Sequence, residues 1–256
     1  MFKRKIQELT IINKINKVEN IIINKKIKLS GIFNTETIGI TCEYSICNIF
    51  FIKTLPNLRS RINISLKEQI TPILDNEISK YFNITNYVGN KNGPVDFITD
   101  NNENISLKTN ISGDKIAPQN IGQATKKKFC EYFKISKEYT DHKIKEYIII
   151  NINKILQEYV KNLFCCDYLI YLSTKINKDK TELNVKSINI FENKISKQLN
   201  NIIKKSNITF TKYLDNWNES TTVKVNNISI GEFQIHNNRD NIKFRFNLKN
   251  LLKLII

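Results

Sequence analysis

Apolar side chains at helical spacing fill the first third of the sequence. Over residues 5–24 they recur every three or four positions, which predicts a helix with one apolar stripe. The same spacing predicts a second helix over about Thr37–Ile52, ending before the Pro56 loop, and a third over about Leu66–Phe82. We expect all three helices to pack on a sheet.

Strands are expected from the point where Gly93-Pro94 breaks the helical pattern. Residues 95–99 and 104–110 flank the polar turn Asp100-Asn-Asn-Glu, which predicts a hairpin. The apolar run over 167–173 is typical of a strand buried on both faces. Helices are expected over about 119–133 and 143–164, and further strands near 183–191, 208–211, 221–225, 228–235 and 243–246.

This order of elements predicts an α/β fold with a mixed central β-sheet flanked by helices. A chain of 256 residues can bury one large core, and nothing in it resembles a long flexible linker. We therefore predict a single domain over residues 1–256, with a core over about 37–175 and a distinct C-terminal region over about 205–256.

The net charge is strongly positive. Lys and Arg number 40 against 24 Asp and Glu, which gives +16. Such a surplus favours a polyanionic partner, because each cation laid on a phosphate releases condensed counterions. Ile, Asn and Lys are all encoded by AT-rich codons, so an AT-rich genome could raise the lysine content without any such partner. The basic surplus still favours nucleic acid.

Cysteine usage and the N-terminus bear on the compartment. The five cysteines form no CxxC pair and have no histidine spacing typical of zinc, so we expect reduced thiols. Charges interrupt the apolar positions of MFKRKIQELT, and no long uncharged run follows, so neither a signal peptide nor a membrane span is expected. A cytoplasmic protein of a bacterium with an AT-rich genome fits these features.

The predicted hairpin carries the candidate catalytic residues. Residues two apart on a strand share a face, so Ser106 and Lys108 point one way while Ile105 and Leu107 point to the core. Asp96 stands on the neighbouring strand. A carboxylate that holds a divalent ion and a lysine that activates water are what metal-dependent phosphodiester hydrolysis needs. An ordinary surface hairpin is the alternative.

The spacing Pro94-Val-Asp96, then Ser106-Leu-Lys108, resembles the PD-(D/E)XK motif of type II restriction endonucleases. It departs from that motif by one extra residue after the proline and by serine where the second acid stands. The resemblance implies a restriction-endonuclease-like core, catalytic Asp96, Ser106 and Lys108, and Mg²⁺ held by Asp96 and the Leu107 carbonyl. It also implies products with a 5'-phosphate and a 3'-hydroxyl.

Two flanking segments extend the resemblance. Glu43 lies among apolar and small residues, and it resembles the glutamate that a preceding helix delivers to the metal in these enzymes. The alternative is an exposed helix acid paired with a lysine. Residues 115–128 resemble the helix after the motif strand, which implies that Gln123 faces the active site and that a lysine run lies near phosphates: Lys126, Lys127 and Lys128. A solvated lysine face is the alternative.

The C-terminal region alternates apolar and polar residues and contains side chains suited to DNA contact. Gln and Asn can pair with adenine, and Arg can pair with guanine. The segment resembles the C-terminal hairpins of several small type II restriction enzymes, so we predict a β-hairpin that reads DNA. Its candidate contacts are Lys224, Gln234, His236, Asn237, Asn238, Arg239, Lys243 and Arg245.

The expected function is a magnesium-dependent, sequence-specific endonuclease on double-stranded DNA, in a restriction–modification system with a cognate methyltransferase. Cleavage of both strands of a palindrome favours a homodimer. No Gly-rich phosphate loop is present, which argues against ATP-driven restriction. The alternatives are a nuclease acting on RNA or on branched or damaged DNA, and a non-catalytic basic DNA-binding protein in which Asp96 and Lys108 form a structural ion pair.

Overall fold

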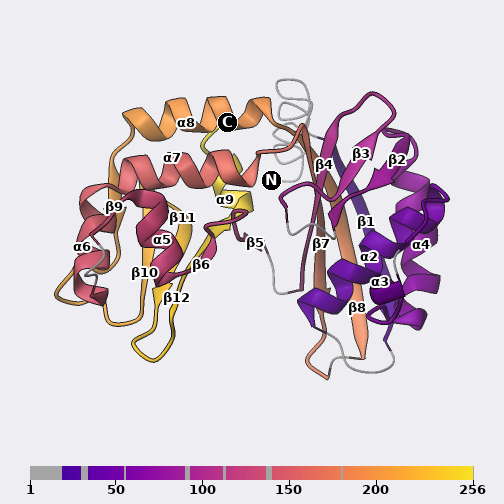
Figure 1. Ribbon diagram of the computed structural model, residues 1–256, viewed down its shortest axis with the longest axis horizontal. Coiled ribbons are helices and arrows are strands. Elements are labelled where there is room, and N and C mark those ends of the chain that lie inside the picture. Colours follow the sequence, from indigo (N-terminus) through magenta and orange to yellow (C-terminus); the bar gives the residue numbers. More distant parts are fainter. Residues whose placement is uncertain are drawn as a thin grey trace, which may run out of the picture. The chain divides into compact units, whose positions relative to one another are not determined.

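The chain forms two compact units in the computed structural model (Figure 1). The first comprises Met1–Gly113 and Cys166–Asn193, and the second comprises Asp114–Cys165 and Lys194–Ile256. The structure describes residues 19–29, 34–54, 56–89, 93–111, 114–136, 140–179 and 181–255. The boundaries of the units differ from the expected regions 37–175 and 205–256, because residues 114–165 pack with the C-terminal segment.

The first unit contains a mixed six-stranded sheet in the order β1-β8-β7-β4-β3-β2. Only β4 and β7 pair in parallel, and the other neighbours are antiparallel. Parallel neighbours need a long crossover, and the second unit supplies it with residues 114–165. The strands are β1 Glu19–Lys28, β2 Ile84–Tyr87, β3 Phe97–Thr99, β4 Asn104–Asn110, β7 Tyr168–Ile176 and β8 Glu182–Glu192.

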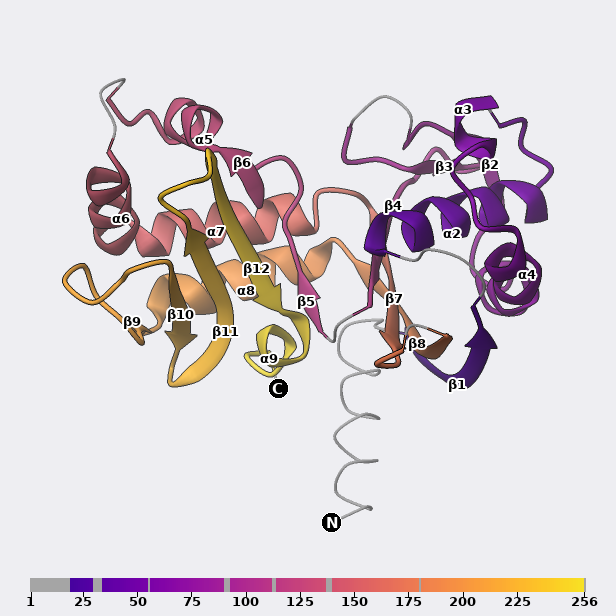
Figure 2. The same ribbon diagram turned by 90° about the horizontal axis from the view of Figure 1, so that it is seen from below.

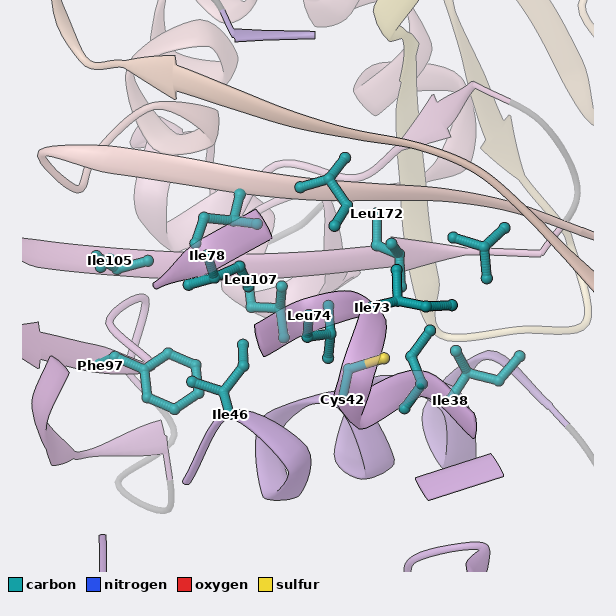
Figure 3. Packing of buried hydrophobic residues seen from close by; sticks show 14 of the residues in the cluster. Ile38, Cys42, Ile46, Ile73, Leu74, Ile78, Phe97, Ile105, Leu107 and Leu172 are labelled. Atoms are coloured by element: carbon teal, nitrogen blue, oxygen red, sulfur yellow. The ribbon is translucent and has the colours of Figure 1, made fainter. Parts of the chain in front are cut away.

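Helices α2 (Thr35–Ile49) and α4 (Ile64–Ile78) cover one face of this sheet, with the short α3 (Pro56–Arg59) between them in sequence. The side chains of Asn34 and Asn63 cap the first turns of α2 and α4 by accepting backbone N–H bonds. The buried sides of both helices meet apolar residues of β3, β4 and β7 (Figure 3). The core therefore fixes α2 against the strand that carries the predicted motif.

The second unit contains an antiparallel sheet in the order β5-β12-β11-β10-β9, with β6 also pairing with β12. Its strands are β5 Lys115–Ile116, β6 Gln123–Thr125, β9 Ile208–Phe210, β10 Ser220–Val225, β11 Ile228–Ile235 and β12 Asn241–Asn247. Its helices are α5 Lys126–Phe133, α6 Asp141–Ile150, α7 Ile152–Leu163, α8 Lys194–Lys205 and α9 Leu248–Leu252. Figure 2 shows α7 and α8 side by side along this sheet.

Aromatic packing gives the second sheet an apolar face. Tyr159 of α7 stacks on Phe244 with ring centroids 4.6 Å apart, and Phe233 and Phe246 also pack against Phe244. Because side chains alternate along a strand, the residues between these aromatics project from the other face. That second face is polar, and it carries four of the predicted DNA contacts: Lys224, Gln234, Lys243 and Arg245.

The structure confirms a mixed sheet flanked by helices, and it confirms the helices near 37–52 and 66–82 and the hairpin of β3 and β4. Three helix predictions need correction, two of them in the middle of the chain. The helix expected over 119–133 begins only at Lys126, after the strand β6, and the helix expected over 143–164 is two helices that meet at Asn151.

The helix expected over residues 5–24 is wrong for Glu19–Asn24, which belong to β1 and pair with β8. Its remaining residues lie outside the described part of the chain. None of the five cysteines, all of which are described, forms a disulfide. No helix within the described ranges is long and apolar enough to cross a membrane.

Candidate active site

The hairpin of β3 and β4 holds Asp96 in a fixed orientation. Asp96 immediately precedes β3, and only 7% of its surface is exposed. Its carboxylate oxygen Oδ2 accepts the backbone N–H of Leu107 at 2.7 Å and the hydroxyl of Ser106 at 3.3 Å. The carboxylate is thus anchored to β4 by one of its two oxygens.

Lys108 lies on the same strand as these two donors. The buried Ile105 and Leu107 belong to the core, and the alternation of side chains puts Lys108 on the face of Ser106. Burial raises the pKa of Asp96, while the charge of Lys108 and the two hydrogen bonds act in the opposite direction. The net shift is upward, so burial outweighs these partners.

Glu43 reaches the same place from α2. Its carboxylate oxygen Oε2 accepts the Tyr87 hydroxyl at 2.7 Å. Burial and the nearby charge of Asp96 raise the pKa of Glu43 to about 7, against the opposing effects of Tyr87, Lys108 and Arg61. A carboxyl group whose pKa is raised by burial and by a second acid is typical of functional sites.

Tyr87 was not predicted from the sequence. It lies on β2, and its ring packs on Phe97 with centroids 5.5 Å apart. Tyr87 is 44 residues from Glu43 in the chain, so no local pattern could have connected them. The structure therefore brings together Glu43, Asp96, Ser106 and Lys108, and adds a tyrosine on Glu43.

The donor atoms of this cluster suit a hard cation. Mg²⁺ prefers carboxylate, carbonyl and water oxygens. The N–H and C=O of one strand residue point to the same side of the strand, so the Leu107 carbonyl lies on the edge where its N–H meets Asp96. The described residues contain no group of three or more His, Cys, Asp and Glu side chains that could hold a metal. The oxygens of Glu43, Asp96 and the Leu107 carbonyl therefore suit Mg²⁺ only when water molecules supply the remaining ligands.

Gln123 does not lie on a helix, and this part of the expectation is wrong. It belongs to β6, whose residues pair with β12, and its register partner is Lys243. The helix begins after it because Thr125 caps α5 by accepting the Lys128 backbone N–H. Gln123 is part of the second unit, whereas Asp96 is part of the first.

The three lysines of the predicted run differ in their surroundings. Lys126 is buried, its ammonium lies 2.6 Å from the Asp141 carboxylate, and it also donates to the His236 carbonyl. Lys127 and Lys128 are exposed. Only these two are open to contact with a large partner.

The C-terminal hairpin formed by β11 and β12 is as expected. Its turn exposes Asn237, Asn238 and Arg239, and His236 at its start lies 3.0 Å from the Glu219 carboxylate. Gln234 of β11 faces Lys243 of β12 in the register, and Lys224 and Arg245 are half-buried on β10 and β12.

Fold and site together define a carboxylate–lysine cluster at a hairpin of a mixed, helix-covered sheet. The sequence is 33% identical over 236 residues to the type II restriction enzyme CviAII of Paramecium bursaria Chlorella virus 1. The similar region includes 91% of this chain, and the chain spans about 64% of the length of that enzyme. No family model matches the chain, and no solved structure matches it significantly.

Proposed function

We propose that the protein is a type II restriction endonuclease that hydrolyses double-stranded DNA at specific sequences with Mg²⁺. The observation that carries the proposal is the grouping of Asp96 and Lys108, from a hairpin of a mixed sheet, with Glu43 of the helix α2. The likeness to a type II restriction enzyme supports the same conclusion. The motif Pro94-Val-Asp96 with Ser106-Leu-Lys108 then represents a variant of the PD-(D/E)XK pattern.

Each residue has a distinct task in this proposal. Mg²⁺, when bound, polarises the scissile phosphate and offsets its charge. Asp96 would help to hold the ion, and Leu107 and Ser106 orient its carboxylate by donating to Oδ2. Glu43 supplies the second acid, because Ser106 has only a neutral hydroxyl. Lys108 orients the attacking water and stabilises the negative charge that develops on the phosphate.

Hydrolysis in this arrangement breaks the bond between phosphorus and the 3' oxygen. Water adds to phosphorus opposite that oxygen, which leaves a 5'-phosphate and a 3'-hydroxyl. Cutting both strands of a palindrome favours two symmetry-related active sites, so we propose a homodimer on DNA. A methyltransferase in the same cell would protect the host's own sites.

The test is cleavage of plasmid DNA with Mg²⁺ and with a chelator. We expect discrete fragments with Mg²⁺ and none with the chelator. Asp96→Asn and Lys108→Ala should each lower the rate by at least about 100-fold, because each removes a group that acts on the transition state. Asp100→Asn is the matched control: Asp100 is an exposed acid on the turn of the same hairpin, and it bonds the Asn83 side chain.

Binding without cleavage under all conditions would favour the alternative of a non-catalytic DNA-binding protein. Cleavage of RNA or of branched duplexes in preference to plasmid would favour the other alternative. Near-parental cutting by Asp96→Asn would exclude the proposed site.

A further inference from the structure

The polar face of the second sheet arranges its side chains in two cross-strand rows. Register partners share a face, so Ser220, Gln234, Lys243 and Gln123 form one row across four strands. The second row consists of Thr222, Glu232 and Arg245. Gln123, which the sequence had associated with catalysis, thus lies beside Lys243, and Gln234 lies on the other side of Lys243.

The cations of this face lie close together. Burial lowers the pKa of Lys243, and the neighbouring charges of Arg245 and Arg239 lower it further. Mutual repulsion of that kind indicates a local excess of positive charge, which attracts phosphates. The face therefore suits a DNA surface.

Glu232 is the one acid in the two rows. Its carboxylate lies 3.1 Å from the Lys115 ammonium and 3.9 Å from the Arg245 guanidinium. Partial burial acts to raise the pKa of Glu232, but Lys115, Gln234 and Arg245 outweigh it and hold the pKa below its ordinary value. The group is ionised at neutral pH, so it can only accept hydrogen bonds.

A shallow hollow opens at the second row. Lys115, Thr222, Ser229, Glu232 and Arg245 line it, with Gly231 and Asn247. The Glu232 side chain is 23% exposed, so its partners orient it while it remains partly open to solvent. The oriented Glu232 carboxylate would repel the negatively charged phosphate oxygens of DNA. The group that fits it is therefore a hydrogen-bond donor.

We infer that Glu232 is a specificity-determining residue that accepts a hydrogen bond from the exocyclic amino group of cytosine or adenine in the target sequence. The inference rests on the proposed function. The major groove of DNA presents these amino groups. Strands β11 and β12 are flanked by β10 and β6 in the sheet, and they carry Glu232, Gln234, Lys243 and Arg245 on its polar face. Lys115 is a positioning residue that holds the carboxylate.

The test uses DNA duplexes in which one exocyclic amino group of adenine or cytosine is missing. The preferred site is first found by selecting the duplexes that the protein binds from a random pool, and it is compared with the ends of any fragments that the protein cuts. Duplexes are then made with purine in place of one adenine, or 2-pyrimidinone in place of one cytosine, at each position in turn. Cleavage with Mg²⁺ and binding without a metal are both measured. The parental protein should lose roughly 5- to 150-fold at the position that Glu232 reads.

Glu232→Ala should lose a similar factor on the unmodified site and show no further loss when that amino group is deleted. Lys115→Ala removes the same ion pair, yet it should retain the dependence on the amino group. Glu158→Ala is the matched control, because Glu158 is also half-buried and paired with a lysine, Lys161, but lies on α7. Thermal unfolding of each variant checks that the unit folds.

If Glu232→Ala keeps the parental penalty at every position, or if Glu232→Ala and Lys115→Ala behave alike, Glu232 only stabilises β5 and the inference fails while the nuclease function stands. If the protein binds with this discrimination but never cuts, the proposed function fails while the inference stands. A protein that neither binds nor cuts DNA overturns both.

Discussion

At the scale of single residues, the raised pKa of Glu43 has a consequence for stability. The folded protein favours the protonated form, with a pKa of about 7 against an ordinary value of 4.5. This group therefore contributes stability that is fully present below about pH 4.5 and is lost as the pH rises through about 7. The difference amounts to up to about 3 kcal/mol.

We accordingly expect Glu43→Gln to stabilise the metal-free protein at pH 8 and to change little at pH 4.5. The reason is that a neutral amide replaces a charge that burial and Asp96 disfavour. Chemical denaturation in the presence of a chelator, at both pH values, measures the free energy of unfolding of the parental protein and the variant. Glu103→Gln is the control, since Glu103 bonds Tyr168 and Thr99 instead. A Glu43→Gln protein that is less stable at pH 8 would contradict the expectation.

Tyr87 also has a testable role, because its hydroxyl holds the Glu43 carboxylate. Tyr87→Phe removes only that hydroxyl and keeps the ring on Phe97. We expect cleavage to need several-fold more Mg²⁺, with a smaller change in the rate at saturating Mg²⁺, because the acid is less well oriented. A magnesium titration of the rate measures this.

The matched control for that titration is Tyr168→Phe, which removes another tyrosine–glutamate hydrogen bond in the same unit, to Glu103. It should leave the magnesium requirement unchanged. Equal shifts in both variants would mean that the hydroxyl of Tyr87 matters only for general packing.

At the scale of elements, α5 separates the lysines that the sequence grouped together. Replacing Lys127 and Lys128 by alanine should weaken binding to all DNA sequences by a similar factor and lower the salt slope by up to about 2. Both side chains are exposed. Fluorescence anisotropy over a range of salt concentrations measures both effects.

Lys126→Ala is the internal comparison for that pair. It removes the contact with Asp141 and should lower the free energy of unfolding by on the order of 2 kcal/mol, because Asp141 loses its partner. The salt slope should stay parental. If Lys126→Ala alone lowered the salt slope, Lys126 would be the residue that contacts phosphates, and Lys127 and Lys128 would not.

Elements with a strong local period could be predicted from the sequence. Helices α2 and α4 and the hairpin with Asp96 and Lys108 follow from spacing and turn residues alone. Strands β1 and β6 could not be predicted in this way, because each depends on a distant partner, β8 and β12. The same limit hid Tyr87 and moved Gln123 from the expected catalytic helix to a sheet.

At the scale of the whole molecule, the chain passes between the two units three times, after Gly113, Cys165 and Asn193. The strand β4, which carries Lys108, pairs with β7, whose residues lie beyond the first part of the second unit in the sequence. Neither unit is a continuous piece of the chain.

This chain order determines when each unit can fold during synthesis on the ribosome. Domains generally form as their residues emerge, starting from the N-terminal side. Here β4 must wait for β7 and β8, so the first sheet is complete only once residue 192 has been made. A nascent chain thus carries Asp96 and Lys108 for many residues before the sheet that orients them exists, so the carboxylate–lysine cluster can form only late in translation.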